Sequence, residues 1–157
     1  LDDNCIRLGP KTGAFSFTLS NLEHNQTYRV KAFATSILGT GFSSEITFTT
    51  VGCIPNCGAT YVSVMDYNYA IAESEITIEE GCSLMEVGVC WSSSHTPTIS
   101  DDKVSQSLPH GTTEFTTGGG LHYLSSSTTY RIRSYAKNEY GDIKYGPEST
   151  FRTPANK

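Results

Sequence analysis

Residues able to do chemistry occur along this chain, but their spacing forms no familiar catalytic or metal-binding motif. There is no G-x-S-x-G nucleophile motif, and the three glycines at 118–120 lack the Lys and the helix that a phosphate loop requires. Paired carboxylates at 2–3, 79–80 and 101–102 could hold Ca²⁺, yet none has the alternating D-x-D-x-D pattern, which favours a solvated surface. Four histidines stand in turn-like surroundings without metal-ligand spacing: His24, His95, His110 and His122. The sequence therefore predicts a protein that is not an enzyme and needs no metal or cofactor.

Aromatic side chains are a further candidate, because exposed rings can stack against a sugar. Tyr67 and Tyr69 share parity opposite the small residues Ala70 and Ala72, so both rings are expected on the outer face of one strand. Together with Tyr135, an outward residue of a later strand, they are the candidate glycan or partner contacts. Ordinary cross-strand packing of these tyrosines is the competing interpretation.

Composition limits the kind of framework that can position these residues. Only 17% of the 157 residues are charged and the net charge is −5, which argues against a nucleic-acid partner. No apolar run approaches the ~18 residues that span a bilayer, so no membrane insertion of this segment is expected. The many Ser, Thr, Gly and Tyr residues indicate a β-rich protein. Five cysteines favour an oxidising compartment, and hence an extracellular or cell-surface location.

An internal repeat organises the chain. "TYRVKAFATS" at 27–36 recurs about one hundred positions later as "TYRIRSYAKN" at 129–138. Further matches are Leu22 with Leu124, Gly39 with Gly141 and, after one inserted residue, Phe48 with Phe151. The period is too long for a solenoid and is typical of a β-sandwich domain, and inward residues alternate along both copies as strands require.

Two features of the repeat resemble a known family. The spacing L-x5-Y at Leu22–Tyr28 and Leu124–Tyr130 is similar to the tyrosine corner of fibronectin type III domains, in which the tyrosine hydroxyl bonds to the backbone. "GVCWSSSHTPTISDDK" at 88–103 and "YGPESTFRTP" at 145–154 resemble a fibronectin type III-like repeat found in tandem in surface and secreted proteins of Bacteroidetes-type bacteria. The resemblance covers almost all of residues 58–154 and implies an all-β, immunoglobulin-like antiparallel β-sandwich.

The repeat also predicts the domain organisation. Residues 58–154 are expected to form one complete domain of seven strands, and residues 51–57 a linker. Residues 1–50 carry only the last four strands of another such domain. Half a sandwich would leave apolar residues such as Phe15 and Phe17 in water. The missing strands are therefore expected to come from a preceding segment or from another chain.

Within the complete domain, parity predicts which residues form the core. Val87, Val89 and Trp91 share one parity and are expected to face inward, with Tyr130 buried at the corner. The glycines at 118–120 predict a loosened or bulged strand before that corner.

Strand direction predicts the disulfides. In an antiparallel sandwich the first strand begins at the end where the second strand turns into the third, which places Cys57 near Cys82. The same reasoning places Cys5 near Cys53 and leaves Cys90 as a free thiol. Rival pairings, Cys53 with Cys57 and Cys82 with Cys90, require a tight ring or a hairpin out of register, and spacing alone does not exclude them.

These expectations favour a non-catalytic spacer or adhesive module of a bacterial cell-surface or secreted multidomain protein. The alternative is a carbohydrate-binding module that uses Tyr67, Tyr69 and Tyr135. The partner is expected to be a protein or glycan at the cell surface, and the first half-repeat to need strands from elsewhere.

Overall fold

The computed structural model describes residues 5–157, and all regular structure in that range is β-strand. Accordingly, no helix among these residues is long and apolar enough to cross a membrane. The chain divides into two compact units, with the boundary between Val51 and Gly52. This agrees with the expectation of an all-β protein.

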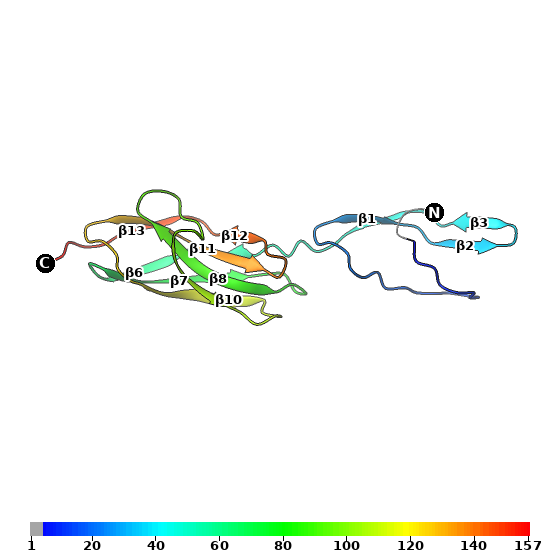
Figure 1. Cartoon of the computed structure of the whole chain (residues 1–157), viewed down its shortest axis with the longest axis horizontal. Helices are drawn as coiled ribbons and strands as arrows, with labels where there is room; N and C mark the ends of the chain where they lie inside the picture. Colours follow the sequence, from blue (N-terminus) through cyan, green and yellow to red (C-terminus); the bar gives the residue numbers. More distant parts are fainter. Residues whose placement is uncertain (1–4) are drawn as a thin grey trace. The chain divides into compact units, whose positions relative to one another are not determined.

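The second unit is a two-sheet antiparallel sandwich (Figure 1). Its strands are β5 (Asn56–Cys57), β6 (Tyr61–Asp66), β7 (Tyr69–Thr77), β8 (Leu84–Ser92), β9 (Asp102–Ser107), β10 (Glu114–Leu121), β11 (Thr129–Asn138), β12 (Ile143–Tyr145) and β13 (Ser149–Arg152). In one sheet β7 lies between β10 and β6, and β5 pairs with the far end of β7. In the other, β8 lies between β9 and β11, and β12 and β13 pair with successive parts of β11. This strand order is that of a fibronectin type III-like, immunoglobulin-like sandwich.

The core forms between the two sheets, where the sequence pattern predicts it. Val87 and Val89 of β8 are fully buried, and Trp91 and Tyr130 are 6% and 7% exposed. These four inward positions are confirmed. On the facing sheet Ala70 and the other inward residues of β7 are also buried, so small side chains on β7 make room for the ring of Trp91.

The glycine-rich strand is not bulged, contrary to the sequence-based expectation. β10 stays in register with β7 through Gly118, Gly119 and Gly120 as far as Leu121. A Cβ atom on Gly118 would lie 2.1 Å from the carbonyl oxygen of Ala72. Glycine at this position therefore permits a close approach of two strands rather than loosening one of them.

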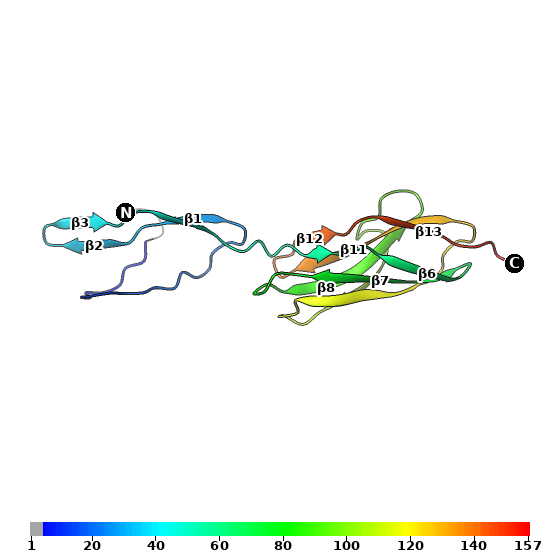
Figure 2. The ribbon, with the colours of Figure 1, turned by 180° about the vertical axis from the view of Figure 1, so that it is seen from behind.

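The first unit contains four short strands, shown in cyan and blue in Figure 2: β1 (Thr27–Val30), β2 (Phe33–Ser36), β3 (Gly39–Phe42) and β4 (Ile46–Thr49). β1 pairs with β4 and β2 with β3, both antiparallel, in two separate ladders. Strands expected before residue 27 are not formed in residues 5–26. The repeated segment thus makes one strand of ten residues in the second unit, β11, but two strands of four residues in the first, β1 and β2.

The segment expected as a linker, residues 51–57, belongs largely to the second unit. Cys53 and Cys57 are 3% and 8% exposed and pack with Ile76 in its core. Asn56 and Cys57 pair with the end of β7 as β5. Proline and glycine in this segment suggest a linker, but its cysteines are core residues.

Candidate functional site

The tyrosine corner is present in the second unit and recurs in the first. The amide of Ser125 donates a hydrogen bond of 2.8 Å to the hydroxyl of Tyr130. One repeat earlier, the amide of Glu23 donates to the hydroxyl of Tyr28 at 2.9 Å. Both pairs are separated by five residues, so the L-x5-Y spacing predicts the position of the corner in both units.

A threonine completes the corner in each unit. The hydroxyl of Thr153 donates to the carbonyl oxygen of Ser125, and that of Thr50 to the carbonyl oxygen of Glu23, both at 2.6 Å. Each threonine hydroxyl also accepts an amide hydrogen bond, from Thr128 at 3.0 Å and from Gln26 at 2.9 Å. The threonine ties the last strand to the turn that precedes the tyrosine strand.

The ring of each corner tyrosine stacks on a phenylalanine of the neighbouring strand. The centroid distance is 5.4 Å for Tyr130 and Phe151 and 5.8 Å for Tyr28 and Phe48. The hydroxyl network, the ring stack and the strand pairing thus repeat together. The corner is a structural device that fixes the end of a sandwich, and it offers no reactive group.

The disulfide joins Cys53 to Cys82, so the expected pairs Cys57–Cys82 and Cys5–Cys53 are wrong. Cys57 lies opposite Ile76, the second-last residue of β7, and so is still beside the strand. Because the chains run antiparallel, a residue several positions before Cys57 is the one that reaches the turn after β7. Cys53 occupies that position, which explains the four-residue error.

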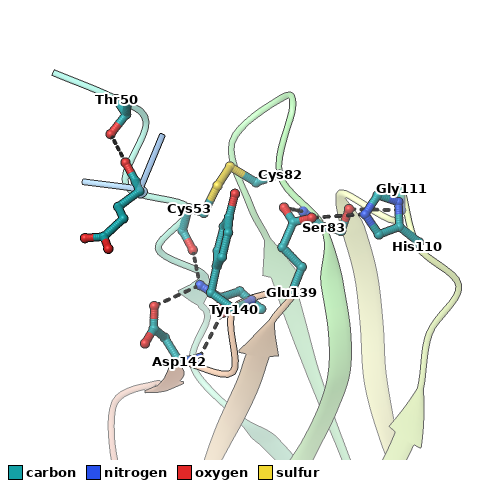
Figure 3. The surroundings of a disulfide bond; sticks show 11 residues. Thr50, Cys53, Cys82, Ser83, His110, Gly111, Glu139, Tyr140 and Asp142 are labelled. Atoms are coloured by element: carbon teal, nitrogen blue, oxygen red, sulfur yellow. Dashed lines mark hydrogen bonds and ion pairs between the residues drawn. A yellow bond between two sulfur atoms is a disulfide. The ribbon is translucent and has the colours of Figure 1, made fainter. Parts of the chain in front are cut away.

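Other groups hold the ends of the strands beside this disulfide (Figure 3). Glu139 accepts a hydrogen bond from the amide of Ser83 at 3.1 Å through one carboxylate oxygen and contacts His110 at 3.0 Å through the other. The side-chain amide of Asn138 donates to the carbonyl oxygen of Cys53 at 2.8 Å. Within residues 5–157, Cys53, Cys82 and Glu139 form the one group with metal-type ligand atoms close together, but the two sulfurs are bonded to each other. The arrangement is a structural clamp.

Cys5, Cys57 and Cys90 are free thiols, as expected for Cys90. Burial raises the pKa of Cys57 to about 11, and its Sγ donates to the carbonyl oxygen of Lys144 at 3.4 Å. Burial also raises the pKa of Cys90. Both buried thiols therefore stay protonated near neutral pH and are poor nucleophiles.

Tyr67 and Tyr69, two of the candidate glycan contacts, are both half-buried. Tyr67 lies in the turn between β6 and β7 and not on the strand. Tyr69 begins β7, and its ring lies 4.8 Å from that of His122 and packs over Gly120. The two tyrosines thus come from different local structures and do not form the expected pair of neighbours on one strand face.

Tyr135, the third candidate contact, is only 1% exposed, so the expectation of an exposed ring is wrong. Its ring lies over Gly88, where a Cβ atom would come within 2.7 Å of a ring carbon. Its hydroxyl donates to Glu86 at 2.7 Å. The alternation along β11 correctly places Tyr135 on the outer face of the strand. Because Gly88 has no side chain, however, the ring lies flat against the sheet and is buried. That glycine, in the middle of an apolar strand, is the signal that could have revealed the burial.

Sequence reasoning did not single out Tyr123, an exposed aromatic residue that lies beside two carboxylates. Its ring is 96% exposed, and it lies on the rim of a shallow hollow of about 480 Å³. Asp101 and Asp102 also line this hollow. A hydrogen bond from the backbone amide of Thr98 is the main reason that the pKa of Asp101 lies below its usual range.

The two ends of the second unit lie at opposite ends of β11. The incoming chain at Cys57 contacts Lys144 of β12, which pairs with the last residues of β11. The outgoing chain at Thr153 bonds to Thr128, just before β11 begins. Figure 1 shows the C-terminus leaving beyond β13, at the end away from β12. The chain thus traverses the length of the sandwich.

No protein-family model and no curated protein matches this sequence. Among solved structures, the sixth fibronectin type III domain of human fibronectin type III domain containing protein 3 is 18% identical, with a TM-score of 0.43, over 64% of this chain and 86% of that one. The sensor domain of the anti-sigma factor RsgI4 in Pseudobacteroides cellulosolvens is 14% identical, with a TM-score of 0.45, over 65% and 96%. Domains d3-d4 of the rat CD45 extracellular region are 19% identical, with a TM-score of 0.39, over 95% and 75%. The assignment of residues 52–157 to the fibronectin type III-like sandwiches stands on strand order and the tyrosine corner.

Proposed function

We propose that this chain is a non-catalytic spacer from a tandem array of fibronectin type III-like domains. The observation that carries the proposal is that the chain enters and leaves the second unit at opposite ends of β11. A domain with this path separates its neighbours by about the length of the sandwich, ~33 Å for a ten-residue strand. The repeated corner network supports a second domain of the same kind in the first unit.

The parent protein is, in this proposal, a bacterial cell-surface or secreted multidomain protein of the Bacteroidetes type. The disulfide between Cys53 and Cys82 supports an oxidising location, because such bonds persist outside the cytosol. The assignment to Bacteroidetes-type bacteria is supported by the resemblance of residues 88–103 and 145–154 to the repeat described above. Its partner at the surface would be a protein or a glycan bound by the array as a whole.

A glycan-binding role is the second candidate, and Tyr123 is the observation that favours it. An exposed ring beside two carboxylates, Asp101 and Asp102, offers both a stacking face and hydrogen-bond acceptors for sugar hydroxyls. Tyr69 and His122 form a second pair of rings, but Tyr69 is half-buried.

A glycan array probed with the full chain separates the two functions. The spacer proposal expects no signal above that of an unrelated sandwich domain. Saturable binding that is lost in Tyr123→Ala but kept in Tyr61→Ala, another exposed tyrosine, would overturn it in favour of the glycan-binding role.

A further inference from the structure

The first unit has an open apolar groove on one face of its strands. The groove has a volume of about 950 Å³ and is lined by residues from 5–19 and from three of the four strands, β1, β2 and β4. Phe15, Phe17 and Ile46 line it with exposed fractions of 54%, 49% and 63%. Apolar side chains that stay this exposed are unfavourable in water, and covering them would stabilise the unit.

The second unit shows what covers the equivalent face there. Tyr130, Ile132 and Phe151 match Tyr28, Val30 and Phe48 of the first unit in ladder position and, for the rings, in stacking. In the second unit these residues pack in one cluster with Ala70 and Ala72 of β7, Val89 and Trp91 of β8, and Val62 of β6. Ile132 is fully buried there, whereas Val30 is only half-buried.

The backbone of the first unit lacks a partner on the same side. In the second unit β11 is bonded to β8 along one edge and to β12 and β13 along the other. The first unit has counterparts of β12 and β13, namely β3 and β4, but the edge equivalent to the β8 side is unpaired among the described residues. The chain breaks its strand at Lys31–Ala32, between β1 and β2, where that edge lacks support.

We propose that this groove and strand edge bind a three-stranded antiparallel segment of the type formed by β6, β7 and β8. The third strand of the segment would pair with the free edge of β1 and β2 and join them into one strand. Small and β-branched side chains on its first two strands would cover Phe48 and Tyr28, as Ala70, Ala72 and Val62 cover Phe151 and Tyr130. The proposal rests on the equivalence of the two units in the proposed function.

The test supplies that segment from the protein's own sequence. A second copy of residues 52–99 is joined ahead of residue 1 of the full chain, and amide hydrogen exchange is measured for both units. Amides of β1, β2 and β4 are expected to exchange at least tenfold more slowly than in the unextended chain. The matched control carries Ala70→Asp and Ala72→Asp in the added copy only, which places carboxylates against the groove and should abolish the gain.

Equal exchange in the extended and unextended chains would overturn the proposal, and so would an equal gain in the control. A third result would also overturn the proposal: slow exchange that is already present in the unextended chain and is lost on dilution. That result would mean that a second copy of the chain covers the groove. Unchanged exchange in the second unit serves as the internal measure of correct folding. A positive glycan array would overturn the spacer function without altering this exchange result, so the two failures are distinguishable.

Discussion

At the scale of single residues, the hydroxyl of Tyr130 can be tested by itself. Tyr130→Phe keeps the ring on Phe151 but leaves the amide of Ser125 without its acceptor. We expect the second unit to lose about 1 kcal/mol of unfolding free energy, the net value of one hydrogen bond. Urea unfolding followed by Trp91 fluorescence measures this unit alone, because Trp91 is the one tryptophan.

Tyr123→Phe is the matched control for that substitution. The ring of Tyr123 is 96% exposed, so its hydroxyl is solvated and its loss should leave the urea midpoint unchanged. Equal effects of the two substitutions would show that the corner hydrogen bond does not stabilise the fold.

The buried thiol of Cys57 makes stability depend on pH in the alkaline range. Burial raises its pKa from 9.0 to about 11. Between these values the unfolded chain loses the thiol proton while the folded chain keeps it, so the unfolded state binds fewer protons. The stabilisation that the protonated Cys57 thiol gives the folded state is therefore complete below pH 9. It declines as the pH rises towards 11 and then levels off.

Comparison with Cys57→Ala isolates this effect. Urea midpoints of the two proteins should run parallel below pH 9, and the midpoint of the unsubstituted protein should fall more steeply from there to pH 11. Parallel curves across the whole range would show that Cys57 titrates normally in the folded state. Cys90 is present in both proteins and does not affect the difference.

At the scale of elements, the close approach of β10 and β7 depends on Gly118. A methyl group there would lie 2.1 Å from the carbonyl oxygen of Ala72, which is backbone and has little freedom to move. Gly118→Ala should cost about 1–3 kcal/mol in the urea unfolding of the second unit, the usual range for overpacking. Thr116→Ala, at an exposed position of the same strand, is the control and should have little effect. An equally small effect of Gly118→Ala would mean that β10 and β7 can move apart without a loss of unfolding free energy.

The long strands could be predicted from sequence because their signal is local. β8 and β11 have nine and ten residues, enough for a period of two to be visible. β12 has three residues between Gly141 and Gly146, and β5 has two, so neither shows a period. The burial of Tyr135 over Gly88 and the choice of Cys53 as the partner of Cys82 depend on contacts between elements, and alternation along one strand does not encode these contacts.

At the scale of the whole molecule, the two units show that the continuity of a strand depends on the strands beside it. The same ten-residue signature forms one unbroken strand where β8 supports it and two fragments where that support is missing. The local network of the corner nevertheless forms in both units, with matching hydrogen-bond lengths. Local side-chain geometry is thus encoded within about thirty residues, whereas strand continuity requires the rest of the sandwich.

The disulfide has a consequence for a chain under tension. A force applied to the two ends of the second unit reaches Cys53 first and passes through the sulfur bridge to Cys82, so β5, β6 and β7 carry no load. The chain between the cysteines, which are 29 positions apart in sequence, stays closed by the bridge when the unit is pulled open. The bridge therefore shortens the released contour length by about 100 Å at ~3.5 Å per residue. Single-molecule force spectroscopy of the full chain should show the longer extension after reduction or in Cys82→Ser. If oxidised and reduced molecules released equal lengths, the bridge would not lie in the path of the force. A protein that carries this bridge and is pulled at its two ends would thus extend less on unfolding in an oxidising medium than in a reducing one.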